Sequence, residues 1–197
     1  VGYASLSSNT TGTNNVSLGK DSLNANTTAS NNTAVGKSAL AVNTTGTDNV
    51  AVGASALDAN TTASNNAAFG KNALGANTTG SLNTAVGSLA AQSITTGNSN
   101  VAVGYNSLSS DTLGDRNVAI GLSTLSSQNF TSSTDSYNVA VGYAAGRDIT
   151  TGTQNTAIGG LALLANTTAS NNTAIGFQAL NANTTGEQNT AVGSNAL

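Results

Sequence analysis

Asn32-Thr33-Ala34-Val35-Gly36 is a five-residue block whose close copies recur along the whole chain. Its glycine returns every 17 residues, except for one step of 21 between Gly121 and Gly142. The glycines of the series are Gly2, Gly19, Gly36, Gly53, Gly70, Gly87, Gly104, Gly121, Gly142, Gly159, Gly176 and Gly193. A short period kept this strictly is typical of stacked repeat architectures, in which each repeat is one structural unit.

The composition favours a thin ordered rod over a globular core or a disordered chain. Only seven of the 197 residues are aromatic, and Trp, Met, Cys and Pro are absent. Polar, low-complexity chains are often disordered. Here, however, the apolar residues return to the same phase of each repeat, which indicates order.

The charge and the missing residue types exclude several classes of function. A net charge of −3 provides no basic surface for nucleic acid, and no apolar run is long enough to span a membrane. The absence of Cys and His removes thiolate metal sites and the commonest catalytic base. We therefore expect no nucleic-acid partner and no membrane insertion.

The residues before each glycine predict a short strand. With the glycine as position zero, position minus one is apolar and position minus three is mostly β-branched, as in Val52 and Val50. We expect these two positions to face the interior, since they share a strand face. Ala51 and its equivalents at minus two then face outward. Their uniformity indicates close contact, either with a second small-residue layer of the same chain or, preferably, with a neighbouring subunit.

Two further positions predict how coils stack. Position minus four is Asn in every copy that includes it, which predicts an amide ladder that satisfies turn backbone groups. Position plus four is Leu except at Ala91 and Gly146, and in those two coils Ile94 and Ile149 replace the usual Asn at plus seven. This exchange of volume predicts that both positions reach the same interior space.

A second turn follows the Asn-Thr-Thr segment of each repeat. Position plus ten is Gly in most copies, and where it is Ala, as at Ala29 and Ala63, Asn appears at plus twelve, as at Asn31 and Asn65. Gly and Asn tolerate a left-handed backbone, so we expect the left-handed site to move by two positions when Gly is lost.

These observations predict an all-β fold, a parallel β-solenoid (β-roll) of about twelve coils with two short strands per coil. At about 4.8 Å per coil the rod is about 55 to 60 Å long. We expect a single array over residues 1–197, with a four-residue insertion loop within residues 126–137. Because the core is thin, we expect lateral packing as a homotrimer. Both ends fall in mid-repeat, so we expect a segment of a longer protein.

The Asn-Thr-Ala-Val-Gly and Asn-Val-Ala-Val-Gly blocks resemble the head repeats of trimeric autotransporter adhesins. They are also similar to arrays in phage tail fibres that carry endosialidase-type chaperone domains. The resemblance implies left-handed β-rolls, three chains in a rigid fibre, an extracellular location on a cell surface or virion, and attachment to a host surface. It also implies a protein or glycan of the host as a partner.

The acidic residues show no pattern that predicts catalysis. They occupy unrelated phases of the repeat, at Asp21, Asp48, Asp58, Asp111, Asp115, Asp135, Asp148 and Glu187. We interpret them as solvated turn charges, and we expect no enzyme activity, cofactor or metal.

Two features are candidate binding sites. Equal phases line up along a solenoid, so position plus one forms a row in which lysines give way to aromatic residues. The row contains Lys20, Lys37, Lys71, Tyr105, Tyr143 and Phe177, and Tyr3 holds the same position. It is either a contact for glycans or a tolerant turn position. The insertion loop, with Phe130 and Tyr137, is either a binding loop or a spacer.

Ice binding is an alternative function. Thr recurs at plus nine with Thr or Ser at plus eleven, as in Thr45 and Thr47, and regular Thr-x-Thr ranks on a flat β-solenoid resemble ice-binding faces. A third reading is a filament in which coils stack end to end through open strand edges.

Overall fold

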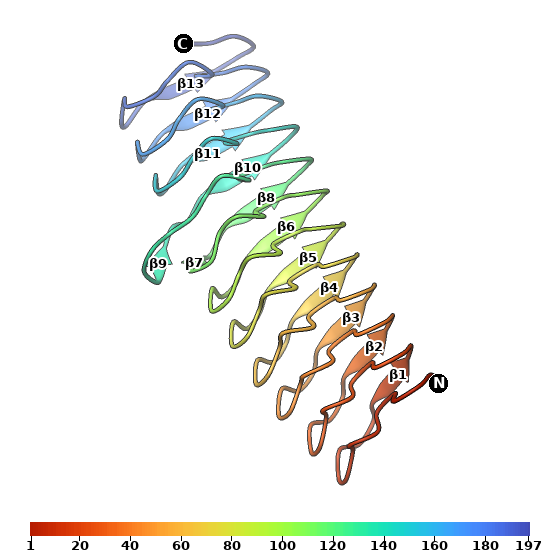
Figure 1. Ribbon diagram of the computed structural model, residues 1–197. Coiled ribbons are helices and arrows are strands. Elements are labelled where there is room, and N and C mark those ends of the chain that lie inside the picture. Colours follow the sequence, from red (N-terminus) through yellow and green to blue (C-terminus); the bar gives the residue numbers. More distant parts are fainter.

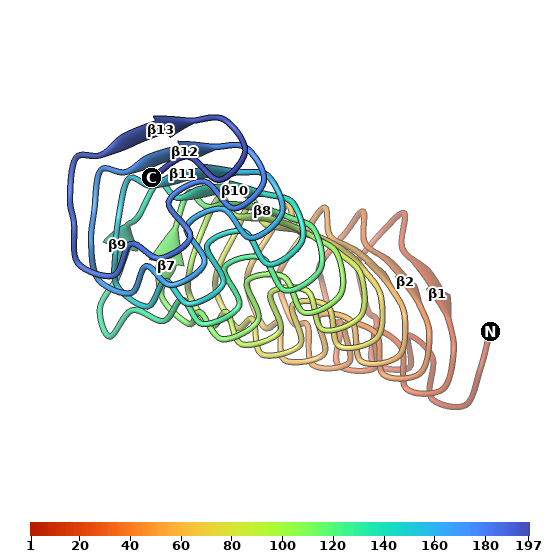
Figure 2. The same ribbon diagram turned by 90° about the horizontal axis from the view of Figure 1, so that it is seen from above.

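The computed structural model describes residues 1–197 as one continuous parallel β-solenoid. Its coils stack like the steps of a ladder, and the two termini lie at opposite ends of the rod (Figure 1). Figure 2, a view turned by 90°, shows the main sheet along one side of the coil, away from β7 and β9. No helix is present, and therefore none that is long and apolar enough to cross a membrane.

Each coil contributes one three-residue strand to an eleven-stranded sheet. The strands are β1 (Val16–Leu18), β2 (Thr33–Val35), β3 (Val50–Val52), β4 (Ala67–Phe69), β5 (Thr84–Val86), β6 (Val101–Val103), β8 (Val118–Ile120), β10 (Val139–Val141), β11 (Thr156–Ile158), β12 (Thr173–Ile175) and β13 (Thr190–Val192). A separate two-stranded sheet pairs β7 (Gly114–Asp115) with β9 (Thr134–Asp135).

All pairings are parallel and in register, so that Thr33, Ala34 and Val35 lie beside Val50, Ala51 and Val52. The predicted parallel solenoid is thus confirmed, with eleven sheet rungs where we expected about twelve coils, because only Val1 precedes Gly2.

The prediction of two strands per coil was wrong. The second extended segment, at plus eight to plus eleven, forms inter-coil bonds that do not make a regular ladder. Thr10 and Thr11 both donate their N–H groups to the Thr27 carbonyl, at 2.8 and 3.2 Å. Thr13 donates its N–H to the Ser30 hydroxyl at 3.0 Å instead of to a carbonyl. Side chains thus replace part of the backbone pairing here, and the segment is a strand only beside the insertion, where β7 pairs with β9.

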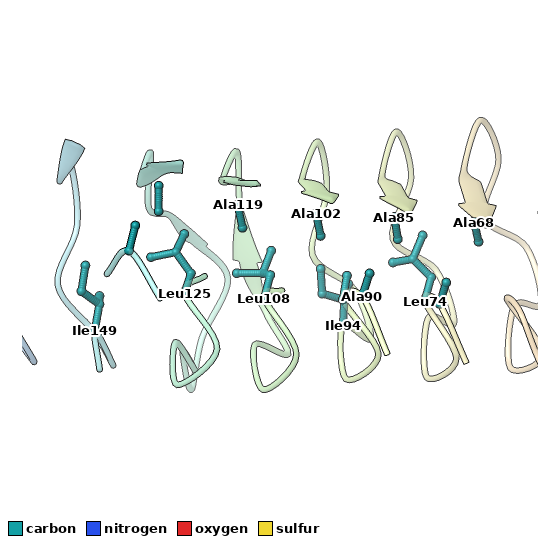
Figure 3. Close-up of a cluster of buried hydrophobic side chains, with 14 of the residues drawn as sticks. Ala68, Leu74, Ala85, Ala90, Ile94, Ala102, Leu108, Ala119, Leu125 and Ile149 are labelled. Atoms are coloured by element: carbon teal, nitrogen blue, oxygen red, sulfur yellow. The ribbon is translucent and has the colours of Figure 1, made fainter. Parts of the chain in front are cut away.

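The interior face of the strands is the opposite of the one we predicted. Ala51 and the other alanines at minus two are buried, whereas Val50 and Val52 are half-exposed and Phe69 is 42% exposed. Figure 3 shows Ala68, Ala85, Ala102 and Ala119 pointing from the strands toward the leucines across the coil. The alanine is uniform because the coil is too flat to hold a larger side chain between strand and leucine. The alanines therefore pack against residues of the same chain. This is the first of the two possibilities given above, and the preferred one, contact with a neighbouring subunit, was wrong for these positions.

The rest of the core comes from two adjacent turn positions. Position plus three is Ala, Ser or Thr, and position plus four is Leu; Ala56 and Leu57 are fully buried. Ser17, the one departure from Ala at minus two, bonds the Ser22 hydroxyl at plus three over 2.6 Å. Positions minus two and plus three therefore meet inside the coil.

The predicted exchange of volume between plus four and plus seven is confirmed. Ile94 and Ile149 are fully buried in the same core cluster as the leucines. A Cβ built on Gly146 would lie 3.0 Å from Ile149 Cδ1 and 3.0 Å from Leu125 Cδ2. The isoleucine therefore occupies the volume that a leucine side chain fills in other coils.

The recurring glycine is required by its backbone conformation and by close packing. Gly36 has a φ of 137°, a region that residues with a Cβ rarely adopt. A Cβ at Gly36 would also lie 2.6 Å from the carbonyl carbon of Gly53 in the next coil. The turn after it uses left-handed residues at plus two and plus four, including Ser55 (φ 54°) and Leu57 (φ 50°). Burial of the leucine offsets the cost of about 1 to 2 kcal/mol of this conformation.

The prediction of a moving left-handed site was wrong. Position plus twelve is left-handed both where plus ten is Ala, as at Asn31 (φ 61°), and where it is Gly, as at Asp48 (φ 59°) and Leu82 (φ 63°). Gly46 at plus ten is not left-handed, and a Cβ there would lie 2.6 Å from Asn43 Oδ1. The residue at plus ten is small because it is packed among asparagine side chains.

The asparagine ladder at minus four is confirmed, and a second ladder runs at plus seven. Asn49 donates its side-chain N–H to the Ala63 carbonyl at 2.8 Å, and Asn60 donates to the same carbonyl at 3.1 Å. Asn49 also donates its backbone N–H to Asn32 Oδ1 at 3.0 Å, and Asn60 donates to Asn43 Oδ1 at 2.9 Å. Each asparagine thus closes its own coil and binds the coil before it.

We predict that Leu57→Ala and Val52→Ala, which lie in one coil, differ strongly in cost. Leu57→Ala removes a fully buried side chain and should lower the free energy of unfolding by about 2 to 5 kcal/mol. Val52→Ala trims a half-exposed side chain and should cost less than about 1 kcal/mol. Urea unfolding of both variants measures the difference, and equal costs would contradict the assignment of the interior face.

Candidate interaction surfaces

The residues at position plus one form a straight row along one edge of the rod. Their backbones are held rung to rung by hydrogen bonds from the N–H at plus two of the next coil. Ser123 donates to the Tyr105 carbonyl at 3.0 Å, Leu161 to the Tyr143 carbonyl at 2.8 Å, and Asn195 to the Phe177 carbonyl at 2.8 Å. The predicted row therefore exists, and the insertion does not interrupt it.

The lysine half of the row lies toward the N-terminal end of the rod. Lys20, Lys37 and Lys71 are all exposed. Lys20 Nζ lies 3.9 Å from Asp21 Oδ2 and 5.8 Å from the centre of the exposed Tyr3 ring. Ala54 interrupts the lysines, so this half presents separated positive charges and not a continuous basic strip.

The aromatic half of the row lies toward the C-terminal end. Tyr105, Tyr143 and Phe177 are 55%, 59% and 53% exposed. They occupy every second coil, with Leu122 and Gly160 between them. A Cβ built on Gly160 would lie 3.5 Å from Phe177 Cδ2, so the Phe177 ring extends over the space that the glycine leaves open.

The insertion is folded against the rod, and the structure corrects our expectation for Phe130. Phe130 is only 5% exposed, and its ring packs next to Gly114 of the preceding coil, so it is not available as a surface contact. Tyr137 is 47% exposed and takes the left-handed position at plus twelve, with φ 50°. Of the two residues, only Tyr137 can touch a partner.

Polar contacts from the preceding coil hold the insertion in place. Arg116 forms an ion pair with Asp135 and lies 5.7 Å from the centre of the Tyr137 ring. The Ser133 hydroxyl donates to Asp115 Oδ2 at 2.9 Å, and the Ser136 hydroxyl donates to Asn117 Oδ1 at 2.8 Å. The insertion is therefore a fixed ridge on the side of the rod.

The outer face of the main sheet is a surface that the sequence analysis missed, because we assigned its residues to the interior. It carries positions minus one and minus three of all eleven rungs, and we call it the outer sheet face. Every residue on it is Val, Ile, Leu, Phe, Ala or Thr, and none is charged. Many of these residues are substantially exposed, including Leu18, Phe69, Val86, Ile120 and Ile158. An uncharged strip that runs the length of the rod is unusual for a protein surface.

The Thr-x-Thr ranks lie on another side of the coil. Thr45 at plus nine is exposed, but the hydroxyl of Thr47 at plus eleven lies 3.4 Å from the Ser64 hydroxyl of the next coil. The Ser64 hydroxyl also accepts the Thr47 N–H at 3.0 Å. The hydroxyls at plus eleven are thus used in joining coils.

Asp111 and Asp115 correct our view of the acidic residues, since Asp111 is fully buried, Asp115 is only 7% exposed, and neither is a solvated turn charge. Asp111 is the more deeply buried of the two. It occupies the plus-seven position of the second asparagine ladder, which is the signal that could have revealed its burial. It accepts hydrogen bonds from Gln128 Nε2 at 2.7 Å and from the Gly114 N–H at 3.1 Å. Burial raises the pKa of Asp111, and these hydrogen bonds lower it in part.

No group of three or more acidic side chains is placed to hold a metal ion, and the surface contains no pocket.

No protein-family model matches the chain, and comparisons with curated proteins and with solved structures find no similar protein.

We predict that Asp111 makes the rod more stable in mild acid. Its pKa is higher in the folded chain than the ordinary 3.8, so the folded state holds the proton more tightly than the unfolded state. The stabilisation that this proton binding contributes to the folded chain is complete below pH 3.8, and it is lost as the pH rises through the pKa of Asp111 in the folded chain. The urea midpoint should therefore rise as the pH is lowered from 7 through the raised pKa toward 3.8.

Asp111→Asn should reduce the dependence of the urea midpoint on pH, because it places a neutral amide at a position where most other coils carry Asn. Asp58→Asn should remove less of the slope, since Asp58 is only half-buried although burial raises its pKa too. An unchanged slope in the Asp111→Asn variant would contradict the assignment.

Proposed function

We propose that the chain is a rigid segment of a surface fibre, of the adhesin or phage tail-fibre kind, that holds other parts at a distance and contacts its target along its side. The observation that carries the proposal is the unbroken register of the coils. The sheet continues from β8 to β10 across the four extra residues with every position still in line. A spacer that must keep its length and direction needs this continuity.

The bonding around the coil supports the same function. Only 21 of the 118 backbone hydrogen bonds lie within strands, and many of the others join consecutive coils through turns, such as Leu40 N–H to the Ala56 carbonyl at 3.0 Å. Coils bonded around their whole perimeter resist bending in every direction. With eleven rungs at about 4.8 Å, the segment is a stiff rod about 50 Å long.

We further propose that three copies associate through their outer sheet faces, turned toward a shared axis. The alanines at minus two no longer support a trimer, because they are core residues of one chain. The outer sheet face replaces them as the basis for association. A strip about 50 Å by 10 Å offers about 500 Å² per chain before side-chain relief is counted, and this area is shared between two neighbours, so each contact is smaller than the about 800 Å² per partner of a standard interface. Its lack of charge suits burial.

We predict that the wild-type chain sediments as a trimer and that Val101→Lys/Val118→Lys makes it monomeric. Both valines lie at minus three on adjacent central strands, so the lysines would place six charges in a trimer interface without entering the core. Sedimentation equilibrium at micromolar concentrations measures the mass.

Thr79→Lys/Thr96→Lys is the matched control, because these threonines are exposed at plus nine, away from the outer sheet face, on two adjacent coils. This variant should remain trimeric. A wild-type chain that is monomeric at all concentrations would refute lateral association, and the spacer function would then rest on a single-chain rod.

Ice binding is a second candidate, and the outer sheet face favours it over the Thr-x-Thr ranks. Thr and aliphatic side chains, with Phe69 as the exception, stand there in two columns, about 4.8 Å apart along the rod and about 6.6 Å apart across it, on a parallel sheet. The rungs Thr156–Ile158, Thr173–Ile175 and Thr190–Val192 show the pattern most regularly. Such spacing can order surface water in two dimensions.

Thermal hysteresis decides this candidate. If it holds, the chain is active as a monomer, Thr156→Lys/Thr173→Lys abolishes the activity, and Thr45→Lys/Thr62→Lys at plus nine leaves it intact. Absence of hysteresis and of ice shaping in the wild-type chain would exclude it.

A further inference from the structure

The aromatic half of the row has a spacing that the outer sheet face and the lysine half lack. Tyr105, Tyr143 and Phe177 stand on β6, β10 and β12 coils, which are alternate rungs of the sheet. Two rungs correspond to about 9.6 Å. The three residues that carry these exposed rings therefore stand in line over about 19 Å at equal backbone intervals, and the Phe177 ring extends from its coil toward Gly160.

The positions between the rings carry no polar side chain. Leu122 is apolar and Gly160 has no side chain, so no polar group rises between one ring and the next. From Ser88 to Ser194 the row contains no charged residue, whereas the N-terminal half holds three lysines. A partner that lies along the aromatic half therefore meets an uncharged, apolar track with phenol hydroxyls at Tyr105 and Tyr143.

We propose that this track, Tyr105, Tyr143 and Phe177, binds an extended, uncharged β-1,4-linked polysaccharide that lies parallel to the rod. In such a chain each sugar is turned by half a rotation from its neighbour, so the same ring face appears at every second sugar. That two-sugar repeat is about 10 Å, close to the two-rung spacing of about 9.6 Å. Sugars one, three and five can then each stack on one ring.

The chemistry of the contact fits a sugar chain better than a protein or a lipid. The C–H groups on the face of a pyranose are weakly positive and pack on the negative face of an aromatic ring. The tyrosine hydroxyls can donate to and accept from sugar hydroxyls at the edges. A rigid row loses little entropy on binding, because the backbone of each ring is already bonded to the next coil.

This inference deepens the proposed attachment function by naming the class of target, and its test is independent of the spacer and trimer proposals. Binding is measured by titration calorimetry of the full chain with cellohexaose and chitohexaose, and by depletion of the chain from solution by cellulose and chitin particles. We expect at least one of the two hexasaccharides to bind at least 10-fold more tightly than its disaccharide, since only the longer chain reaches all three rings. We expect no binding of maltohexaose, whose α-linkages coil the chain.

Tyr143→Ala, which removes the central ring, should weaken hexasaccharide binding at least 10-fold, and Tyr105→Ala/Tyr143→Ala/Phe177→Ala should abolish it. Ala54, Ser88 and Ser194 occupy the same position in other coils, so small residues there are compatible with the fold. Tyr3→Ala is the matched control, an exposed tyrosine in the same position outside the track, and it should leave binding unchanged.

Failure of all four β-linked probes to bind, equal binding of maltohexaose, or full binding by the triple variant would each overturn the proposal. None of these results would bear on sedimentation as a trimer, so failure of this inference and failure of the fibre proposal remain distinguishable.

Discussion

Paired hydrogen bonds of buried asparagines determine how each coil sits on the next. The Asn49 side chain donates to the Ala63 carbonyl of its own coil, while its Oδ1 accepts the backbone N–H of Asn66 in the following coil at 3.0 Å. Both bonds are shielded from water. A coil that slipped would leave an amide and a carbonyl unpaired in the interior, at a cost of about 1 to 3 kcal/mol for each group. The repeated ladder therefore imposes one register on the whole rod.

The thin core is a consequence of that register. Because each coil lies directly above the last, an Ala methyl faces a Leu in most coils, and Phe130 beside the insertion is the one buried aromatic side chain. Where Ile94 replaces Asn in the second ladder, the core regains the volume that is missing at Ala91, but Asn77 Oδ1 is left without a partner. The lost donor is the amide that Asn would have supplied at position 94. Position plus seven can therefore carry either Asn, which continues the ladder, or Ile, which fills the core. In the coil where Ala91 leaves space, this position is Ile94, so the core is filled and the ladder is interrupted.

Because all coils share this register, residues at equivalent positions of the repeat also form rows on the outside of the rod. A single substitution in this rod changes one element of a row and leaves its neighbours in place, so the two halves of the row at plus one can differ in chemistry without any change in fold. The insertion is tolerated for a related reason. It lies away from the main sheet, where turns and side chains carry the inter-coil bonds, and Arg116, Asp115 and Asn117 of the preceding coil hold it.

Much of the fold and of its surface rows could be predicted from the sequence alone. A strict period of 17 specifies that the repeats stack, and stacking aligns the residues at equivalent positions of the repeat. The parallel solenoid, the asparagine ladder at minus four, the exchange between Ala91 and Ile94, and the straight row through Tyr105 and Tyr143 all follow from periodicity. Each depends only on the statement that residues 17 apart are neighbours. The single sheet strand per coil did not follow, because Ser30 and its equivalents replace carbonyl acceptors with hydroxyls.

The repeat period does not determine which face of each strand points into the coil. An alternation with a period of two is unchanged when the two faces are exchanged, so Val50 and Val52 were equally consistent with either side. The distance across the coil decided the matter, since it leaves room for a methyl group between strand and Leu57 and for nothing larger. Burial of Phe130 was likewise settled by its contact with the preceding coil, and burial of Asp111 by hydrogen bonds from Gly114 of its own coil and Gln128 of the following one. Repetition along a chain specifies which residues are neighbours, whereas the space between chain segments, which exists only once the coil has closed, decides which of them are inside.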